Sequence, residues 1–321
     1  MSNGKKFSFA RFYDRFGVLC LLAIVVIIAT ILTPNFLTRA NISNVLRQNV
    51  SIIILGCGCC FVLISGNINI AYDGLIACIG TISALVMAAT QNLFISVIVG
   101  MIVGAVFGYL YGIFVSKFQI PPFICGLAFS SVATGIIMLI TNGVAVPKTK
   151  LGNFSVLGQG YISGIPISVI IMIVILVASH IILTKTCFGM KVKAVGGNRE
   201  AAITSGINVG RVIRQVFVLD GVICAIAAVL YMSRINSGDG TAGSGICFDA
   251  ITAVCVGGVS IQGGTGGIIG MVFGGCIVGV INNLLNLLNV DSNWQDVVSG
   301  LIILFAVAVD IAVKNSLTKK K

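Results

Sequence analysis

Hydrophobic residues fill most of the chain in runs of about 20, and short polar segments separate these runs. An α-helix needs roughly 20 apolar residues to cross the hydrocarbon core of a bilayer, so each run predicts one membrane-spanning helix. The predicted fold class is therefore all-α, a polytopic membrane protein with about ten transmembrane helices. These helices are expected near residues 16–33, 45–65, 74–90, 93–116, 122–141, 166–184, 212–233, 248–262, 267–288 and 294–313.

The order of the helices indicates an inverted repeat. Helices 2–5 (45–141) and helices 7–10 (212–313) form two groups that enter the membrane from opposite sides. Inverted repeats of this kind are typical of transporters, whose solute path lies where the two halves meet. We predict the repeat from topology alone, because the residues of the two halves do not match convincingly.

Composition agrees with a membrane protein. The chain is 57% hydrophobic and only 9% charged, with a mean hydropathy of +1.10, whereas a soluble domain has about 25% charged residues. Its net charge of +11 does not indicate a nucleic-acid partner, because the cations gather at the ends of apolar runs. Most of the eleven cysteines lie inside those runs, where cysteine acts as a small hydrophobic residue.

Charge also predicts the orientation. With ten crossings, a basic loop (185–211) lies on the same side as residues 1–15 and residues 314–321, which are basic too. The positive-inside rule identifies that side as the cytoplasm. We therefore expect a cytoplasmic N-terminus (1–15), a transmembrane domain (16–313) and a cytoplasmic tail (314–321) in the cytoplasmic (inner) membrane. The five cations expected outside are Arg39, Arg47, Lys148, Lys150 and Arg234.

The basic loop contains the signature of one short helix. Gly196 and Gly197 are expected to break the chain, and Asn198 is a favourable N-cap. Glu200 lies in the first turn, where an acid complements the helix dipole, and Gly206 is a suitable C′ residue. A helix of about two turns, far below the ~12–15 residues that are marginal in water, must be ordered by packing against its own bundle or a partner.

Two polar breaks interrupt the apolar pattern. Ser65–Gly74 offers Asn67, Asn69, Tyr72 and Asp73, which could present amide, hydroxyl and carboxylate groups to a polyol. Such a break at membrane depth must line a cavity or be buried in protein, and the alternative is an ordinary interfacial turn.

The second break, Asn236–Gly245, has a G-x-G-x-x-G spacing. A dinucleotide site would need a strand before it, whereas a membrane helix precedes it here. An external or re-entrant loop that shapes the path is expected instead.

Asp220 is the one acid well inside a predicted span. A charge there costs roughly 2.5–3.5 kcal/mol on insertion scales, so it should face the bundle interior or be paired. Two interpretations stay open: a structural pair with Arg214, or a path-lining or proton-linked role. The chain has one histidine and no G-x-S-x-G, H-E-x-x-H or P-loop motif, so we expect no catalytic residue and no metal site.

The segment Phe188–Asn208 resembles the cytoplasmic loop of ribose-type permeases of ABC importers, which belong with the branched-chain amino acid permeases. Thr33–Leu37, Ile120–Ile124 and Phe248–Val254 match that family as well. Two departures are Asn69, where the family usually has an acid, and Cys247, where it usually has glutamate. The resemblance implies a coupling helix that docks into the ATPase, and its residues here are Gly197, Asn198, Glu200, Ala201, Ala202, Ser205 and Gly206.

The resemblance further implies a transport subunit without enzymatic activity. Its partners would be an ATPase subunit that holds ATP and Mg²⁺, a second copy or a related permease, and an extracytoplasmic solute-binding protein. The solute would be small and polar, such as a monosaccharide like ribose, with nucleosides or branched-chain amino acids as alternatives and a stand-alone secondary transporter as the runner-up. The matching motifs add Phe123, Asp249 and Asn282 to the solute-path candidates, beside Asn67, Asn69, Tyr72, Asp73 and Asp220.

Overall fold

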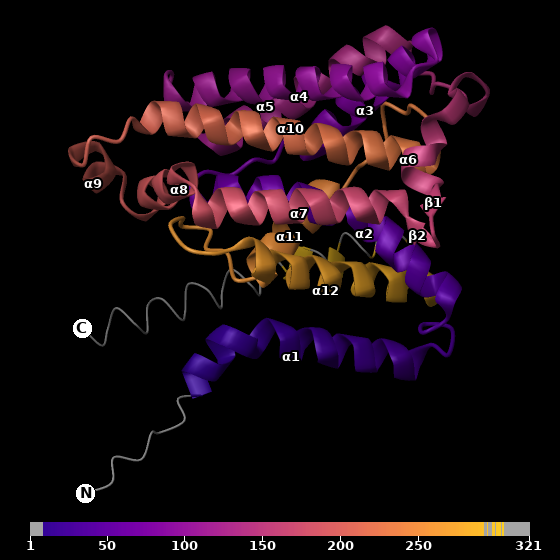
Figure 1. The fold of residues 1–321 in the computed structure, drawn as a ribbon, viewed down its shortest axis with the longest axis horizontal. Coiled ribbons are helices and arrows are strands. Elements are labelled where there is room, and N and C mark those ends of the chain that lie inside the picture. The colour runs from indigo at the N-terminus through magenta and orange to yellow at the C-terminus, as the bar shows by residue number, and fades with distance from the viewer. Residues whose placement is uncertain (1–8, 292–293, 295–296, 299, 303, 305–321) are drawn as a thin grey trace, which may run out of the picture.

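The computed structural model is a bundle of helices packed side by side (Figure 1) and describes residues 9–291, 294, 297–298, 300–302 and 304. A two-stranded hairpin and two short 3₁₀ turns lie between α5 and α7. The helices are α1 Phe9–Leu32, α2 Arg39–Ile64, α3 Tyr72–Thr90, α4 Leu93–Ser116, α5 Pro122–Thr141, α6 Val156–Gln159, α7 Ile167–Lys185, α8 Cys187–Gly197, α9 Arg199–Thr204, α10 Val209–Ile235, α11 Ile246–Val256 and α12 Ile268–Leu287. The hairpin pairs β1 Tyr161–Ile162 with β2 Ile165–Pro166, and the 3₁₀ turns are Lys148–Lys150 and Gly152–Ser155.

The predicted all-α, polytopic membrane fold is confirmed. Seven of the described helices are long and apolar enough to cross a membrane, namely α2, α3, α4, α5, α7, α10 and α12. The first predicted span corresponds to α1, whose segment Val18–Leu32 is apolar. Most of the tenth predicted span, 294–313, lies outside the described residues.

The eighth predicted span is wrong as a full crossing. Only α11 forms there, and its 11 residues reach about 16 Å, roughly half of a hydrocarbon core about 30 Å thick. The helix ends at Gly257, and Gly258, Gly263 and Gly264 then adopt positive φ angles of 81°, 90° and 77°. These left-handed conformations suit glycine and end the helix, although the segment stays apolar in composition.

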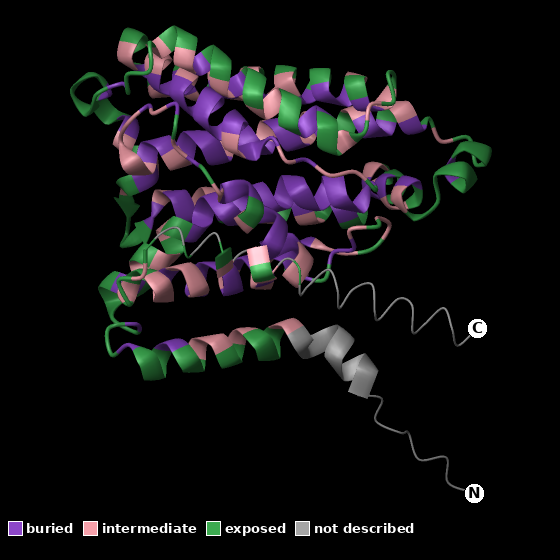
Figure 2. Cartoon of the chain, turned by 180° about the vertical axis from the view of Figure 1, so that it is seen from behind, coloured by how far each residue is buried: buried purple, intermediate pink, exposed green. Residues whose placement is uncertain are grey.

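Two helices form the centre of the bundle. α2 and α10 pack on each other and are the most buried of the long helices, and the central ribbons in Figure 2 are accordingly largely purple. α10 packs against α3 and α4, and α2 packs against α11 and α12 in the same way. This matched pairing of described helices is the one expected for an inverted repeat of the two predicted groups of spans, 45–141 and 212–313.

Close helix packing depends on small residues. On α4, Gly104 lies against the backbone of Gly221, and Gly108 lies against the carbonyl of Phe217, so any side chain there would collide with α10. Membrane helices approach this closely where small residues repeat every four positions. Gly104 and Gly108 therefore let α4 pack closely against α10 within one chain.

Candidate functional site

The short helix α9 forms as the sequence predicts. Asn198 is the N-cap, and its Oδ1 accepts a hydrogen bond of 2.9 Å from the backbone N–H of Ala201. Gly206 has a φ of 80°. Its N–H donates to the carbonyl of Ile203, and the N–H of Ile207 donates to the carbonyl of Ala202. These two bonds form the Schellman motif of a helix C-terminus. Both ends of α9 are therefore fixed by local hydrogen bonds.

The predicted break lies one residue later than expected, at Asn198. Gly196 and Gly197 are the last two residues of α8, and Asn198 is its C-cap. Gly196 is needed for close packing instead, because a Cβ there would collide with the carbonyl oxygen of Ile64 and with Gly264. The glycines let the end of α8 meet the end of α2 and the loop that precedes α12.

α9 projects from one end of the bundle, beyond the ends of α8 and α10 (Figure 1). Within α9 only Ala202 is buried, whereas Arg199 and Glu200 are exposed. The side chain of Ile203 is 56% exposed, although it is apolar and lies on the projecting element. We did not single out Ile203 from the sequence, yet an isoleucine within an otherwise small and polar helix is a signal that could have identified it.

Asp220 sits in a buried polar junction of α3, α10 and the segment before α3. Its exposed fraction is 2%, and its two carboxylate oxygens have separate donors. Asn69 Nδ2 donates to Oδ2 at 2.7 Å, and the hydroxyl of Tyr72 donates to Oδ1 at 2.8 Å. Gly58 of α2 leaves room for this carboxylate, because a Cβ there would collide with it. The predicted pairing with Arg214 is wrong, since that side chain borders a groove on the outside of α10.

The junction leaves little free space. The void beside Asn69 and Asp220 measures about 10 Å³ and is also lined by Tyr111 and Phe217. That is about the room needed for one water molecule and far too small for a sugar. In this conformation, Asn69, Tyr72 and Asp220 therefore hold helices together.

The two polar breaks meet. Asp73, in the first turn of α3, accepts hydrogen bonds from the backbone N–H groups of Gly245 (3.2 Å) and Cys247 (2.8 Å). These N–H groups belong to the start of α11, so one carboxylate lies at the N-terminal ends of two helices, where the helix dipoles favour negative charge. The loop 236–245 therefore returns from the end of α10 to the interior of the bundle.

The remaining candidates lie apart from this junction. Asn282 Nδ2 donates to Asp249 Oδ2 at 2.9 Å, which links α12 to α11. The side-chain amide of Asn67 donates to Ser65, two residues away. Phe123 lies on α5 with 53% of its surface exposed. The structure thus joins Asn69, Tyr72 and Asp220 in one cluster and leaves Phe123 on the surface.

Comparisons with known proteins give a consistent result. A family model described as the permease component of branched-chain amino acid transport systems matches residues 41–307. The chain is 40% identical to a ribose import permease protein of Bacillus subtilis (strain 168) over 309 residues, which cover 95% of each chain. It is 38% identical to an L-arabinose transport system permease protein of Escherichia coli (strain K12), over 95% of this chain and 92% of that one. A ribose import permease protein of Haemophilus influenzae is 34% identical, over 95% of both chains.

Proposed function

Because the chain belongs to the family of branched-chain amino acid transport system permease components, we propose that it is the translocating subunit of an ABC importer that carries a monosaccharide into the cell. The observation that carries this proposal is α9, a capped helix that projects from the bundle and exposes Ile203. An exposed apolar residue on a protruding element is the kind of anchor that a partner protein buries. We assign this contact to the ATPase subunit.

The mechanism we propose is mechanical. α9 packs on α8 and on the start of α10, so a displacement of α9 reaches α10 directly. α10 carries Asp220, whose bonds to Asn69 and Tyr72 tie it to the start of α3. ATPase closure would thus move α10 together with the start of α3, and this movement would alternate access to the path between the halves. No catalytic residue of this chain takes part.

The other partners follow from this assignment. ATP and Mg²⁺ would be held by the ATPase subunit, and a solute-binding protein would deliver the sugar on the opposite side. A second copy of this chain, or a related permease, would complete the path. We place α9 in the cytoplasm because the basic loop 185–211 contains it. We assign both termini to the same side because they are basic too.

Ribose and arabinose are the first solutes to test, because the names of the similar permeases specify these two sugars. We expect cells that express this chain with its ATPase and binding protein to accumulate one of the two pentoses, and to stop when the ATPase cannot hydrolyse ATP. Accumulation of leucine or a nucleoside in place of either pentose would contradict the proposed solute class. Uptake that continues without the ATPase would contradict the importer itself.

A further inference from the structure

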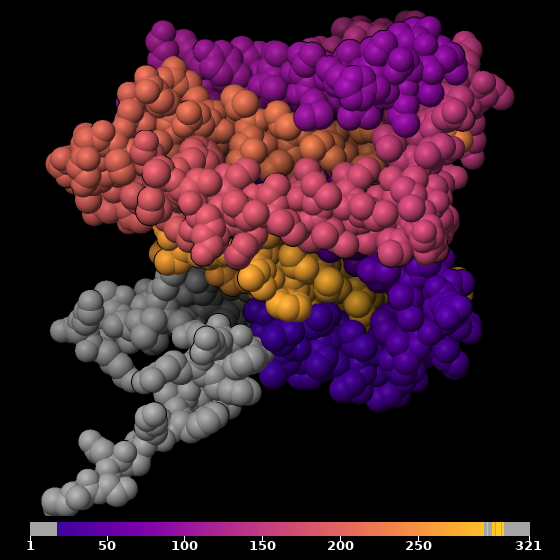
Figure 3. Space-filling model, viewed as in Figure 1, coloured from indigo at the N-terminus to yellow at the C-terminus, as the bar shows by residue number. Residues whose placement is uncertain are grey.

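A groove runs along the outer face of α10, where this helix passes between α4 and α7. Figure 3 shows α10 between these two helices. The groove has a volume of about 620 Å³, within the range of roughly 300–1,000 Å³ that is usual for small-molecule sites. It is separate from the buried void at Asp220, whose lining comes from the inner face of α10.

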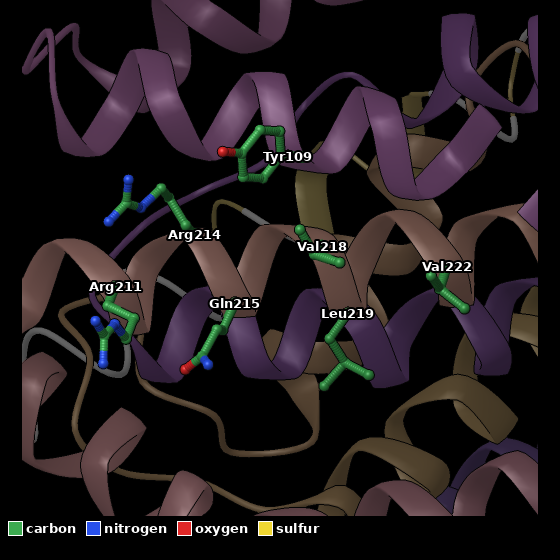
Figure 4. Close-up of a pocket in the computed structure, with 7 residues that line it drawn as sticks. All are labelled: Tyr109, Arg211, Arg214, Gln215, Val218, Leu219 and Val222. Carbon is green, nitrogen blue, oxygen red and sulfur yellow. The ribbon is translucent and has the colours of Figure 1, made fainter. Parts of the chain in front are cut away.

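The chemistry of the groove changes along its length. Arg211 and Arg214 lie at one end, and the hydroxyl of Tyr109 points toward that end (Figure 4). The other end consists of the apolar side chains Val218, Leu219 and Val222. No acid lines the groove, and neither guanidinium forms an ion pair within the described part of the chain. The site is therefore cationic at one end and apolar at the other.

The length of the groove matches one leaflet of a membrane. Arg211 and Arg214 lie in the first two turns of α10, at the end of the bundle that carries α8 and α9. From Arg211 to Val222 an α-helix rises about 16 Å, and half of a hydrocarbon core is about 15 Å. The cations thus lie at headgroup depth when the apolar side chains lie at acyl-chain depth.

From this match we infer that the groove binds an anionic phospholipid of the leaflet on the α9 side. Its phosphate contacts Arg211 and Arg214, and one acyl chain lies along Val218, Leu219 and Val222. Guanidinium groups bind phosphate with paired hydrogen bonds, and basic sites between membrane helices bind anionic headgroups. The inference rests on the groove alone and does not depend on which solute the protein carries.

Lipid binding to the purified full-length chain tests this inference. We expect native mass spectrometry to show phosphatidylglycerol bound at least tenfold more tightly than phosphatidylcholine. The double variant Arg211→Gln/Arg214→Gln should bind phosphatidylglycerol about twenty-five-fold more weakly, since each cation contributes about a factor of five. The control Lys148→Gln/Lys150→Gln makes the same charge change on exposed residues at the opposite end and should retain it.

Equal binding of the two lipids would overturn the inference, and so would an equal loss in both double variants. Displacement of the lipid by millimolar inorganic phosphate would also overturn it, because the site would then bind free phosphate. In membranes that contain the assembled importer, photoactivatable phosphatidylglycerol should label the peptide around 211–222. Absence of that label would overturn the inference for the assembled importer, because a partner chain would then cover the groove.

Discussion

Exchanging Asn69 and Asp220 should leave the protein nearly as stable as it was, whereas Asn69→Asp alone should destabilise it. In the wild-type protein, Asn69 Nδ2 lies 2.7 Å from Asp220 Oδ2. The single variant therefore places two carboxylates face to face in this buried site. Close like charges at a site shielded from water cost several kcal/mol, and about 3 kcal/mol corresponds to a melting temperature lower by roughly 5–10 °C. In Asn69→Asp/Asp220→Asn the same pair of groups is restored with donor and acceptor reversed.

The exchange keeps the other bonds of the junction as well. The hydroxyl of Tyr72 can still donate to the side-chain oxygen at position 220, and the N–H of Ala71 can still donate to the side chain at position 69. Thermal unfolding of the four proteins in one detergent provides the measurement. If the double variant were as unstable as the sum of its single variants, the hydrogen bond between these side chains would not be what holds the junction.

Asp220→Leu serves as the harsher comparison. It removes both acceptors and leaves the Asn69 amide and the Tyr72 hydroxyl unpaired inside the bundle, at about 1–3 kcal/mol for each group. We expect it to fall below Asp220→Asn in melting temperature and in yield. Under the alternative of a proton-linked secondary transporter, Asp220→Asn would abolish transport, whereas we expect an ATP-driven importer with this substitution to continue uptake.

Gly206→Val should abolish most solute uptake while the protein still reaches the membrane in normal amount. Gly206 has a φ of 80°, and no atom lies within 4 Å of a Cβ built there, so the damage comes from the backbone and not from a collision. A β-branched residue disfavours this conformation by at least about 1–2 kcal/mol, which releases the C-terminus of α9. A released α9 can no longer transmit movement to α10.

Gly164→Val is the matched control for this variant. Gly164 has a φ of 82°, and a Cβ there would also meet nothing within 4 Å, but it lies in the hairpin at the opposite end of the bundle. We expect Gly164→Val to transport at close to the wild-type rate. Normal uptake by Gly206→Val, or an equal loss in both variants, would argue against a specific role for α9.

The sequence predicts the features that depend on neighbours along the chain. The ends of α9 were predictable because Asn198 and Gly206 act on backbone groups within four residues of themselves. The spans were predictable because the bilayer fixes the length of an apolar helix. α11 was predicted too long, because hydrophobicity continues past Val256 while the glycines after it take left-handed conformations.

The contacts of the junction were not predictable in the same way. Asp220 meets Asn69 across 151 residues, and Asp73 meets Cys247 across 174, so only the packing of the two halves brings them together. Nearness in sequence suggests the pairing of Asp220 with Arg214. Residues six apart point to different faces of a helix, since neighbours on one face are three or four apart, and this rule could have excluded the pair.

The central claim is that an ATPase subunit grips α9, and binding of that subunit to the purified permease tests it most directly. Ile203→Asp places a charge where the account puts the buried anchor, and Ile162→Asp changes an isoleucine of similar exposure, 55% against 56%, at the opposite end. We predict that Ile203→Asp weakens ATPase binding at least about thirtyfold, the loss expected for an interface anchor, and that Ile162→Asp binds as the wild type does. Unchanged binding by Ile203→Asp would contradict the account.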